Sequence, residues 1–196
     1  MSKSPLAPVT AEELAAALPR VLAAPLDAGP VRLLCARPKP NARTFPETLT
    51  LTRRDGVAGD FEMSRPWLEL PDGSADPRIQ VSILPWRVLE LVWRERDRIA
   101  HPGDNIVVDM NLTDQNLPVG TLLSVGTAVL RISDVPNDGC VKWKVRQGKA
   151  AYDWVSTPAN AHLRLRGLFC SVEQDGVVRL GDSVHALKSP EPPHHQ

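Results

Sequence analysis

The chain has 196 residues, and its 23 lysines and arginines balance 23 aspartates and glutamates, so its formal net charge is zero. A chain of this length buries roughly 70% of its unfolded surface, enough for one domain that needs no disulfides. The balanced charge argues against nucleic acid as a partner, because an overall basic surface is absent and any anion site must be local. No apolar run approaches the roughly 20 residues of a membrane-spanning helix, so we expect no membrane partner.

The three cysteines, Cys35, Cys140 and Cys170, are odd in number and show no Cys-x-x-Cys spacing. This pattern argues against a disulfide framework and against a structural zinc site, and it fits a reducing, cytoplasmic location. Cys35 and Cys170 stand among apolar residues of expected strands, so we interpret both as core thiols.

Near the start, Thr10 and Glu13 form a capping-box signature that predicts a short helix ending at Pro19. We therefore expect an N-terminal helical extension over residues 1–28. Period-two alternation and β-branched residues then predict strands. The strands expected in the first half are 31–38, 48–54 and 77–84, with a tight glycine connection at 55–60.

A helix over 85–97 is expected to be the longest of the chain, with Pro85 in its first turn. After it the pattern turns to sheet, interrupted by a short helix over 150–155. Asp175 and Gly176 predict a hairpin turn. The later strands are expected over 121–133, 163–173 and 182–187, before a proline-rich, disordered tail at 189–196.

Many short strands, few helices and 19 prolines predict a mainly β fold, a barrel or sandwich with a few short peripheral helices. No linker divides the chain after the N-terminal extension. We therefore expect one domain over residues 29–188.

Cys140 follows a run of turn-forming residues, Pro136 to Gly139, which predicts that its thiol lies at the mouth of a loop. The next basic residues are Lys142, Lys144, Arg146 and Lys149, and their positive charges favour the reactive thiolate form of the cysteine. Two plainer interpretations stay open: an incidental thiol, and a basic run that is only a solvated face.

The segments "HPGDNIVVDMNL", "PVGTLLSVGTAVLRISDVPNDGCVKW" and "LRLRGLFCSVEQDGVVRLGDSV" resemble, in order and spacing, the MOSC domain of stand-alone bacterial proteins. That domain is named after the C-terminal part of molybdenum-cofactor sulfurases. The family's loop cysteine falls on Cys140. Its glycine-containing elements fall on Gly103 with Asn105, Arg166 with Gly167, and Gly181 with Asp182.

The chain departs from the family pattern at three places. It has Gly-Asp-Asn where Gly-Glu-Asn is usual, "DGSADPR" where many members have His-Gly-Gly, and Gly139 where many have proline before the cysteine. These differences leave the resemblance in place and bear on which substrate is used.

The resemblance implies a barrel of the MOSC and pyruvate-kinase type, and a molybdenum–pterin cofactor whose metal is ligated by Cys140, the catalytic residue. It implies reduction of N-hydroxylated compounds with electrons from a separate electron-transfer protein, since the chain shows no dinucleotide fingerprint or iron–sulfur motif. The family is also associated with pyridoxal phosphate binding. The alternative from a different class is a non-catalytic module that carries sulfur as a persulfide on Cys140 or hands on a cofactor.

A pterin cofactor carries a phosphate, which arginine side chains bind in bidentate fashion. Plainer roles stay open for several candidates, since asparagine caps turns and glycine serves backbone geometry. The cofactor-binding candidates are Arg53, Arg54, Asn105, Lys142, Lys144, Arg166 and Gly167.

Overall fold

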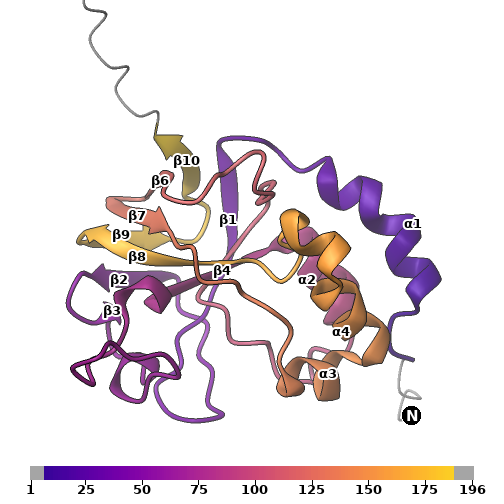
Figure 1. The fold of residues 1–196 in the computed structure, drawn as a ribbon, viewed down its shortest axis with the longest axis horizontal. Helices are drawn as coiled ribbons and strands as arrows, with labels where there is room; N and C mark the ends of the chain where they lie inside the picture. Colours follow the sequence, from indigo (N-terminus) through magenta and orange to yellow (C-terminus); the bar gives the residue numbers. More distant parts are fainter. Residues whose placement is uncertain (1–6, 188–196) are drawn as a thin grey trace, which may run out of the picture.

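The chain folds into a closed seven-stranded β-barrel with a group of short helices on one side (Figure 1). The structure is a computed structural model, and it describes residues 7–187. The strand-rich fold class expected from the sequence is confirmed.

The regular elements are mostly short, as the frequent prolines and glycines predict. The strands are β1 Gly29–Leu34, β2 Thr48–Thr52, β3 Gly56–Val57, β4 Val81–Pro85, β5 Ile106–Val108, β6 Leu122–Val125, β7 Ala128–Ile132, β8 Leu168–Gln174, β9 Gly176–Arg179 and β10 Ser183–Leu187. The α-helices are α1 Ala11–Leu22, α2 Trp86–Val92, α3 Val141–Gln147 and α4 Lys149–Ser156. Three 3₁₀ turns are η1 Glu62–Ser64, η2 Pro77–Ile79 and η3 Pro158–Leu163.

The barrel follows the strand order β1-β10-β6-β7-β8-β4-β5, and a three-stranded sheet has the order β3-β2-β9. Strands β4 and β5 pair in parallel, with Ile83 opposite Ile106, and the other barrel pairs are antiparallel. Closure pairs both edges of every barrel strand, which removes the exposed edges that invite aggregation.

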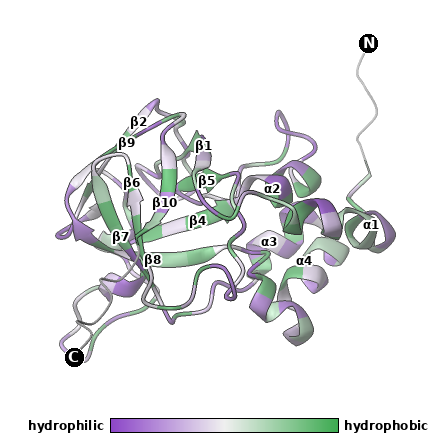
Figure 2. Cartoon of the chain, turned by 90° about the horizontal axis from the view of Figure 1, so that it is seen from above, coloured by the Kyte–Doolittle hydropathy of each residue, from purple (hydrophilic) through white to green (hydrophobic). Residues whose placement is uncertain are grey.

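Strand β4 explains where the helices sit, because its residues are buried on both faces. Val81 and Ile83 point into the barrel core, whereas Leu84 joins a second hydrophobic cluster outside it. Helices α1, α2 and α4 cover this second cluster, which includes Leu14 and Val155. Figure 2 shows the helices gathered at that side of the barrel, with hydrophobic and hydrophilic stretches alternating along them.

Helix α1 begins as predicted: Glu13 N–H donates to Thr10 Oγ1 at 3.2 Å, and Thr10 N–H donates to Glu13 Oε2 at 2.8 Å. The predicted end at Pro19 is wrong, since the helix continues through Pro19 to Leu22. The continuation buries Val21 in the second cluster, and this burial offsets the missing N–H of the proline.

Four other expectations about elements are wrong. Helix α2 has 7 residues and α1 has 12, so the helix after Pro85 is not the longest. Residues 163–167 are not part of strand β8, and residues 77–79 form a 3₁₀ turn. The turn at Asp175 does not make a hairpin, because β9 pairs with β2, where Leu49 lies opposite Val178.

The described part of the N-terminal extension packs in the same cluster as α2 and α4, through Val9, Leu14 and Val21. The division into residues 1–28 and 29–188 stays a prediction. The predicted tail at 189–196 lies outside the described residues. Within residues 7–187, no helix is both long enough and apolar enough to cross a bilayer.

Candidate functional site

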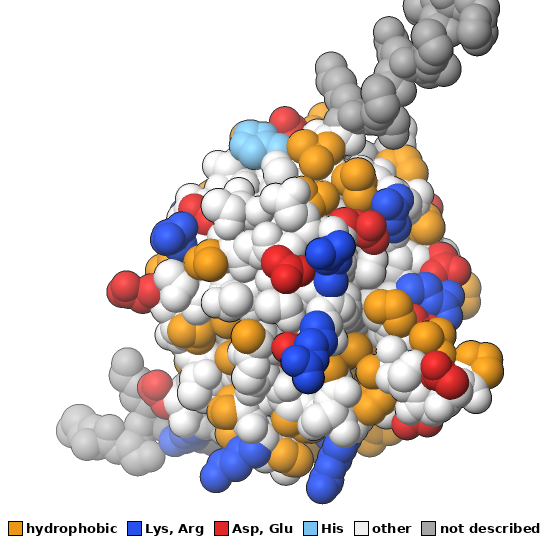
Figure 3. Space-filling model, turned by 90° about the vertical axis from the view of Figure 1, so that its left-hand side faces the viewer, with side chains coloured by type: hydrophobic (Ala, Val, Ile, Leu, Met, Phe, Trp, Pro, Cys, Tyr) orange, Lys and Arg blue, Asp and Glu red, His pale blue; other side chains and the backbone are white. Residues whose placement is uncertain are grey.

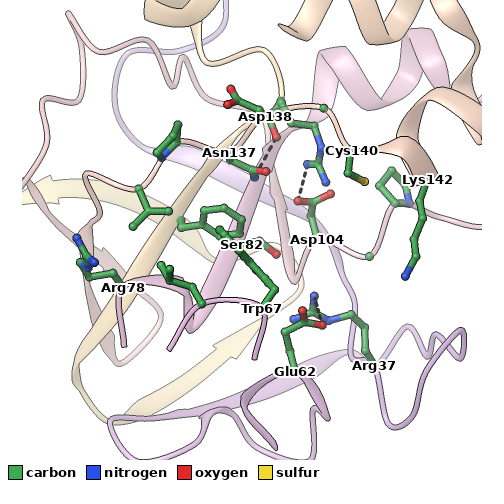
Figure 4. Close-up of a pocket in the computed structure, with 18 of the residues that line it drawn as sticks. Arg37, Glu62, Trp67, Arg78, Ser82, Asp104, Asn137, Asp138, Cys140 and Lys142 are labelled. Atoms are coloured by element: carbon green, nitrogen blue, oxygen red, sulfur yellow. Dashed lines mark hydrogen bonds and ion pairs between the residues drawn. The ribbon is translucent and has the colours of Figure 1, made fainter. Parts of the chain in front are cut away.

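A cleft of about 870 Å³ lies beside the Cys140 loop, and this volume is within the range of small-molecule and cofactor sites. Its wall comes from separate loops that the barrel topology brings together (Figure 4). The lining residues used below are Arg37, Arg43, Phe61, Glu62, Trp67, Arg78, Asp104, Asp134, Asn137, Gly139, Cys140, Lys142, Arg166 and Phe169.

Cys140 is the exposed thiol of this cleft, at the residue that precedes helix α3. Its predicted position at the end of a loop is as observed. Cys35 and Cys170 are fully buried, as the core interpretation expects. Burial raises the pKa of Cys35 to about 12 and also raises the pKa of Cys170. The three thiols therefore differ sharply in access, and only that of Cys140 faces the cleft.

The loop before Cys140 is held against the barrel and helix α4. Asn137 Nδ2 donates to the carbonyl oxygen of Arg166 at 3.2 Å. A Cβ atom at Gly139 would come within 2.6 Å of Ser156 Oγ and 3.1 Å of the Tyr152 ring. Glycine is therefore required at position 139 for the loop to approach α4 this closely.

Arg166 fixes the loop from the other side. Its Nη1 donates to Asp104 Oδ1 at 2.7 Å, and both side chains are almost completely buried. Its guanidinium also lies 4.5 Å from the ring centroid of Trp143, the third residue of α3. Arg166 thus contacts the segments before and after Cys140, so its main role is to position the loop.

Two cations of the cleft have no ion-pair partner among residues 7–187. Arg43 donates only to backbone carbonyls, those of Ala42, His101 and Pro102. Lys142 is exposed at the rim, one residue after Val141. Burial lowers the pKa of Arg43, and the nearby charge of Arg146 adds to this effect. An incoming anion therefore meets two positive charges that no carboxylate neutralises.

The other cleft arginines are already paired. Arg37 Nε lies 2.9 Å from Asp60 Oδ2 and its Nη1 lies 3.4 Å from Glu62. Arg78 pairs with Asp76 at 2.7 Å and with Asp134 at 3.1 Å. These pairs make the cleft mixed in charge, and its cations without an ion-pair partner among residues 7–187 are Arg43 and Lys142.

The aromatic residues that line the cleft, Phe61, Trp67 and Phe169, were not singled out from the sequence. Trp67 lies with its ring centroid 5.7 Å from that of Phe169, and Phe61 lines the same cleft. Trp67 is 56% exposed, an unusual state for so large an apolar ring. Such a surface suits stacking against a flat heterocycle. The signal available in the sequence was a tryptophan in a loop rich in turn residues.

Several predicted site residues lie elsewhere. Arg53 and Arg54 are outside the cleft lining, highly exposed, and pair with Asp175 and Asp55. Lys144 is also outside the lining, and its Nζ lies 5.5 Å from the Tyr152 ring centroid. The structure brings together Cys140, Lys142 and Arg166 from the predicted set.

Asn105 and Gly167 act on the backbone behind the cleft. Asn105 is fully buried; its Oδ1 accepts from Ser82 N–H at 3.1 Å, and its Nδ2 donates to Asp60 Oδ2 at 3.0 Å. Gly167 has φ of 89°, and a Cβ there would collide with the carbonyl oxygen of Ile83. Gly167 therefore serves backbone geometry, its plainer interpretation, whereas Asn105 links Ser82 to Asp60 rather than capping a turn.

His101 supports the loop that carries Asp104. Gly103 N–H donates to His101 Nδ1 at 3.0 Å, and the His101 ring packs edge-on against Trp93. Burial lowers the pKa of His101 to about 4, so the ring is neutral at pH 7. A neutral ring can accept the Gly103 hydrogen bond, which helps to keep Asp104 facing Arg166.

Comparison with known families decides the assignment. The family model of the MOSC domain matches residues 80–185, a span that contains Cys140, Asp104 and Arg166. The chain belongs to the MOSC domain family. The matched span runs from the strand that separates barrel core from helices to the last barrel strand.

Solved structures of low sequence identity share this fold. YuaD from Bacillus subtilis has 20% identity and a TM-score of 0.53, with 82% of this chain and 97% of that chain covered. YiiM from Geobacillus stearothermophilus has 16% identity and a TM-score of 0.53, with coverages of 82% and 75%. A crystal structure of a hypothetical protein has 19% identity and a TM-score of 0.54, with coverages of 83% and 70%. No curated protein matches the chain.

Proposed function

We propose that this MOSC protein binds a molybdenum–pterin cofactor in the cleft and reduces N-hydroxylated compounds, with electrons from a separate protein. One observation carries the proposal: the single cleft-facing thiol, Cys140, shares the cleft with two unpaired cations and with aromatic side chains. The three free cysteines of the chain suit a reducing compartment such as the cytoplasm.

The donor set fits the cofactor. Residues 7–187 hold no group of three or more His, Cys, Asp or Glu side chains placed to bind a metal ion. A metal here must therefore arrive with most of its ligands, as it does in a pterin cofactor, and take one soft thiolate from the protein. Arg43 and Lys142 would hold the phosphate, and Phe61 and Trp67 would flank the flat ring system.

When bound, the molybdenum–pterin group would supply the chemistry that removes an oxygen atom from the substrate, a reaction that consumes two electrons. The balance is R–NH–OH + 2 e⁻ + 2 H⁺ → R–NH₂ + H₂O, in which the N–O bond breaks and an N–H bond forms. The chain's own part is to fix the ligating sulfur through the Arg166 contacts, to bind the phosphate, and to limit water at the aromatic side chains.

A sulfur carrier is the second candidate, and a different observation favours it. Such a carrier needs one exposed thiol and no further metal ligands, and Cys140 is the exposed cysteine of the described chain. An acceptor nucleophile would attack the outer sulfur of a Cys140 persulfide, and the Cys140 thiolate would leave. The buried Cys35 and Cys170 cannot intercept that persulfide as an internal disulfide.

Activity assays distinguish the two. Protein purified from a host that makes the cofactor is supplied with reduced methyl viologen and an N-hydroxylated purine. We expect amine formation with wild type and a loss of at least a hundredfold with Cys140→Ala, while Cys170→Ala retains activity. No turnover by cofactor-loaded wild type, together with a mass increase of one sulfur on Cys140, would favour the carrier. Spectroscopic analysis of released ligands separates a pterin from pyridoxal phosphate, which would use the same two cations of the cleft.

A further inference from the structure

Helix α3 exposes apolar side chains that folding does not explain. Val141 and Val145 are 75% and 79% exposed, the highest values among the large apolar residues of the described chain. They are four residues apart and therefore share one face of the helix. The opposite face carries Trp143 and Gln147, both buried. Valine is a weak helix former, so neither propensity nor burial accounts for two valines on the outer face.

The same face is basic. Lys142 and Lys144 flank the two valines on α3, which contains no acidic residue, and neither lysine has an ion-pair partner within residues 7–187. Arg146 is half-buried and lines a separate hollow beside Pro8 and Val92. The concentration is local, because the chain as a whole has no net charge. On the barrel face opposite the helices, by contrast, Lys and Arg side chains lie among Asp and Glu side chains (Figure 3), as in the Arg131–Glu173 pair.

The face borders the reactive thiol. Cys140 immediately precedes α3, and Lys142 lines the cleft. With a rise of 1.5 Å per residue, Val145 lies only about 7.5 Å along the helix axis from Cys140. A protein seated on this face would be close to the sulfur that is proposed to hold the metal.

We propose that the outer face of α3, formed by Val141, Lys142, Lys144 and Val145, is the docking surface for an acidic one-electron carrier protein. This inference rests on the proposed function, which needs an external supply of two electrons. Two reduced carriers would each give one electron and leave oxidised, while two protons come from water. Electron-transfer complexes are small, so two apolar residues in a basic surround make an interface of suitable size.

Binding can be measured without any cofactor. Isotope-labelled full-length protein, free of metal, is titrated with an acidic plant-type [2Fe–2S] ferredoxin, and amide chemical shifts are followed at low salt and at 0.5 M salt. We expect shifts confined to α3 and the Cys140 loop, which disappear at high salt because charge attraction is screened.

Val145→Asp should weaken ferredoxin binding at least tenfold, and Val145→Lys should weaken it less, because the added positive charge offsets part of the lost apolar contact. Leu180→Asp is the matched control, since Leu180 is 52% exposed on the chain between β9 and β10. Absence of binding at low salt, shifts centred elsewhere, or unchanged affinity in Val145→Asp would overturn the inference.

Turnover separates this inference from the proposed function. With reduced methyl viologen, which needs no docking surface, Val145→Asp should match wild type. With reduced ferredoxin, its KM for the carrier should rise about tenfold. If wild type fails with viologen as well, the proposed function fails, and the binding titration still decides the docking surface. Equal ferredoxin KM values for Val145→Asp and wild type would contradict the docking surface alone.

Discussion

The guanidinium of Arg166 lies against the indole of Trp143, 4.5 Å from the ring centroid, and so ties the segment before strand β8 to the helix that follows Cys140. The same guanidinium pairs with Asp104 at 2.7 Å in an almost fully buried position. Placement of the Cys140 thiol therefore depends on two contacts of Arg166, the stacking on Trp143 and the ion pair with Asp104.

Replacing Arg166 by methionine leaves the buried Asp104 carboxylate unpaired. Breaking a buried pair by removal of one partner destabilises proteins by about 3–5 kcal/mol, and we expect a loss in this range for Arg166→Met. The double variant Arg166→Met with Asp104→Asn should recover more than half of that loss. Urea unfolding measures both. Equal destabilisation in the single and double variants would show that the pair contributes little.

Thiol access separates the three cysteines. Native protein should take up one equivalent of iodoacetamide, on Cys140, and unfolded protein three. Because burial raises the pKa of Cys35 to about 12, the native count should stay at one from pH 7 to pH 10. Mass spectrometry of digested protein gives the modified residue. Labelling of Cys35 or Cys170 in native protein would show that the core opens more readily than its burial indicates.

Two glycines with similar backbone angles make a matched pair. Gly167 and Gly181 have φ of 89° and 87°, but a Cβ at Gly181 would meet nothing within 4 Å, whereas one at Gly167 would collide with Ile83. Gly181→Ala should cost about 1–2 kcal/mol for the left-handed backbone alone. Gly167→Ala should cost clearly more, measured by urea unfolding. Equal losses of stability in the two variants would mean that the barrel adjusts to the methyl group at position 167 without a further free-energy cost.

The free energy of unfolding should decrease at low pH because of His101. Its pKa of about 4 in the folded state lies below the ordinary value of 6.5. Between these values the unfolded chain binds a proton that the folded chain does not, so stability falls as pH drops from 6.5 to 4. The loss reaches about 3 kcal/mol, since one pKa unit corresponds to 1.36 kcal/mol.

His101→Asn should remove this part of the pH dependence, because asparagine can accept the Gly103 hydrogen bond and does not titrate. The measurement is the free energy of unfolding in urea at pH 6.5 and pH 4.5. His162→Gln, at an exposed histidine, is the control. A variant that keeps the full wild-type slope would show that His101 does not contribute to it.

The loop that carries Cys140 could be predicted because it depends on residues that are neighbours in the sequence. Residues 136–139 disfavour regular structure, the chain has neither helix nor strand over them, and Cys140 follows directly. The walls of the cleft could not be predicted in this way. Arg43, Trp67 and Phe169 come from segments far apart in sequence, and only the closed barrel brings them together.

Strand positions were predicted better than strand partners. Alternation predicted strand over 121–133, and β6 and β7 both lie within that range, but the turn at Gly126 that separates them was not predicted. The turn at Asp175 predicted a hairpin, yet β9 leaves the barrel and pairs with β2, which supplies Leu49 and Leu51 opposite it. Pairing between distant strands depends on tertiary packing that a turn signal does not contain.

Cofactor content tests the central claim most directly. Wild type, Cys140→Ala and Cys170→Ala are purified from one host that makes the molybdenum–pterin cofactor, and molybdenum and pterin are measured per chain. The account predicts both near one per chain in wild type and in Cys170→Ala, with molybdenum lost from Cys140→Ala. Wild type that carries neither, or Cys140→Ala that retains the metal in full, would contradict ligation by the cleft thiolate.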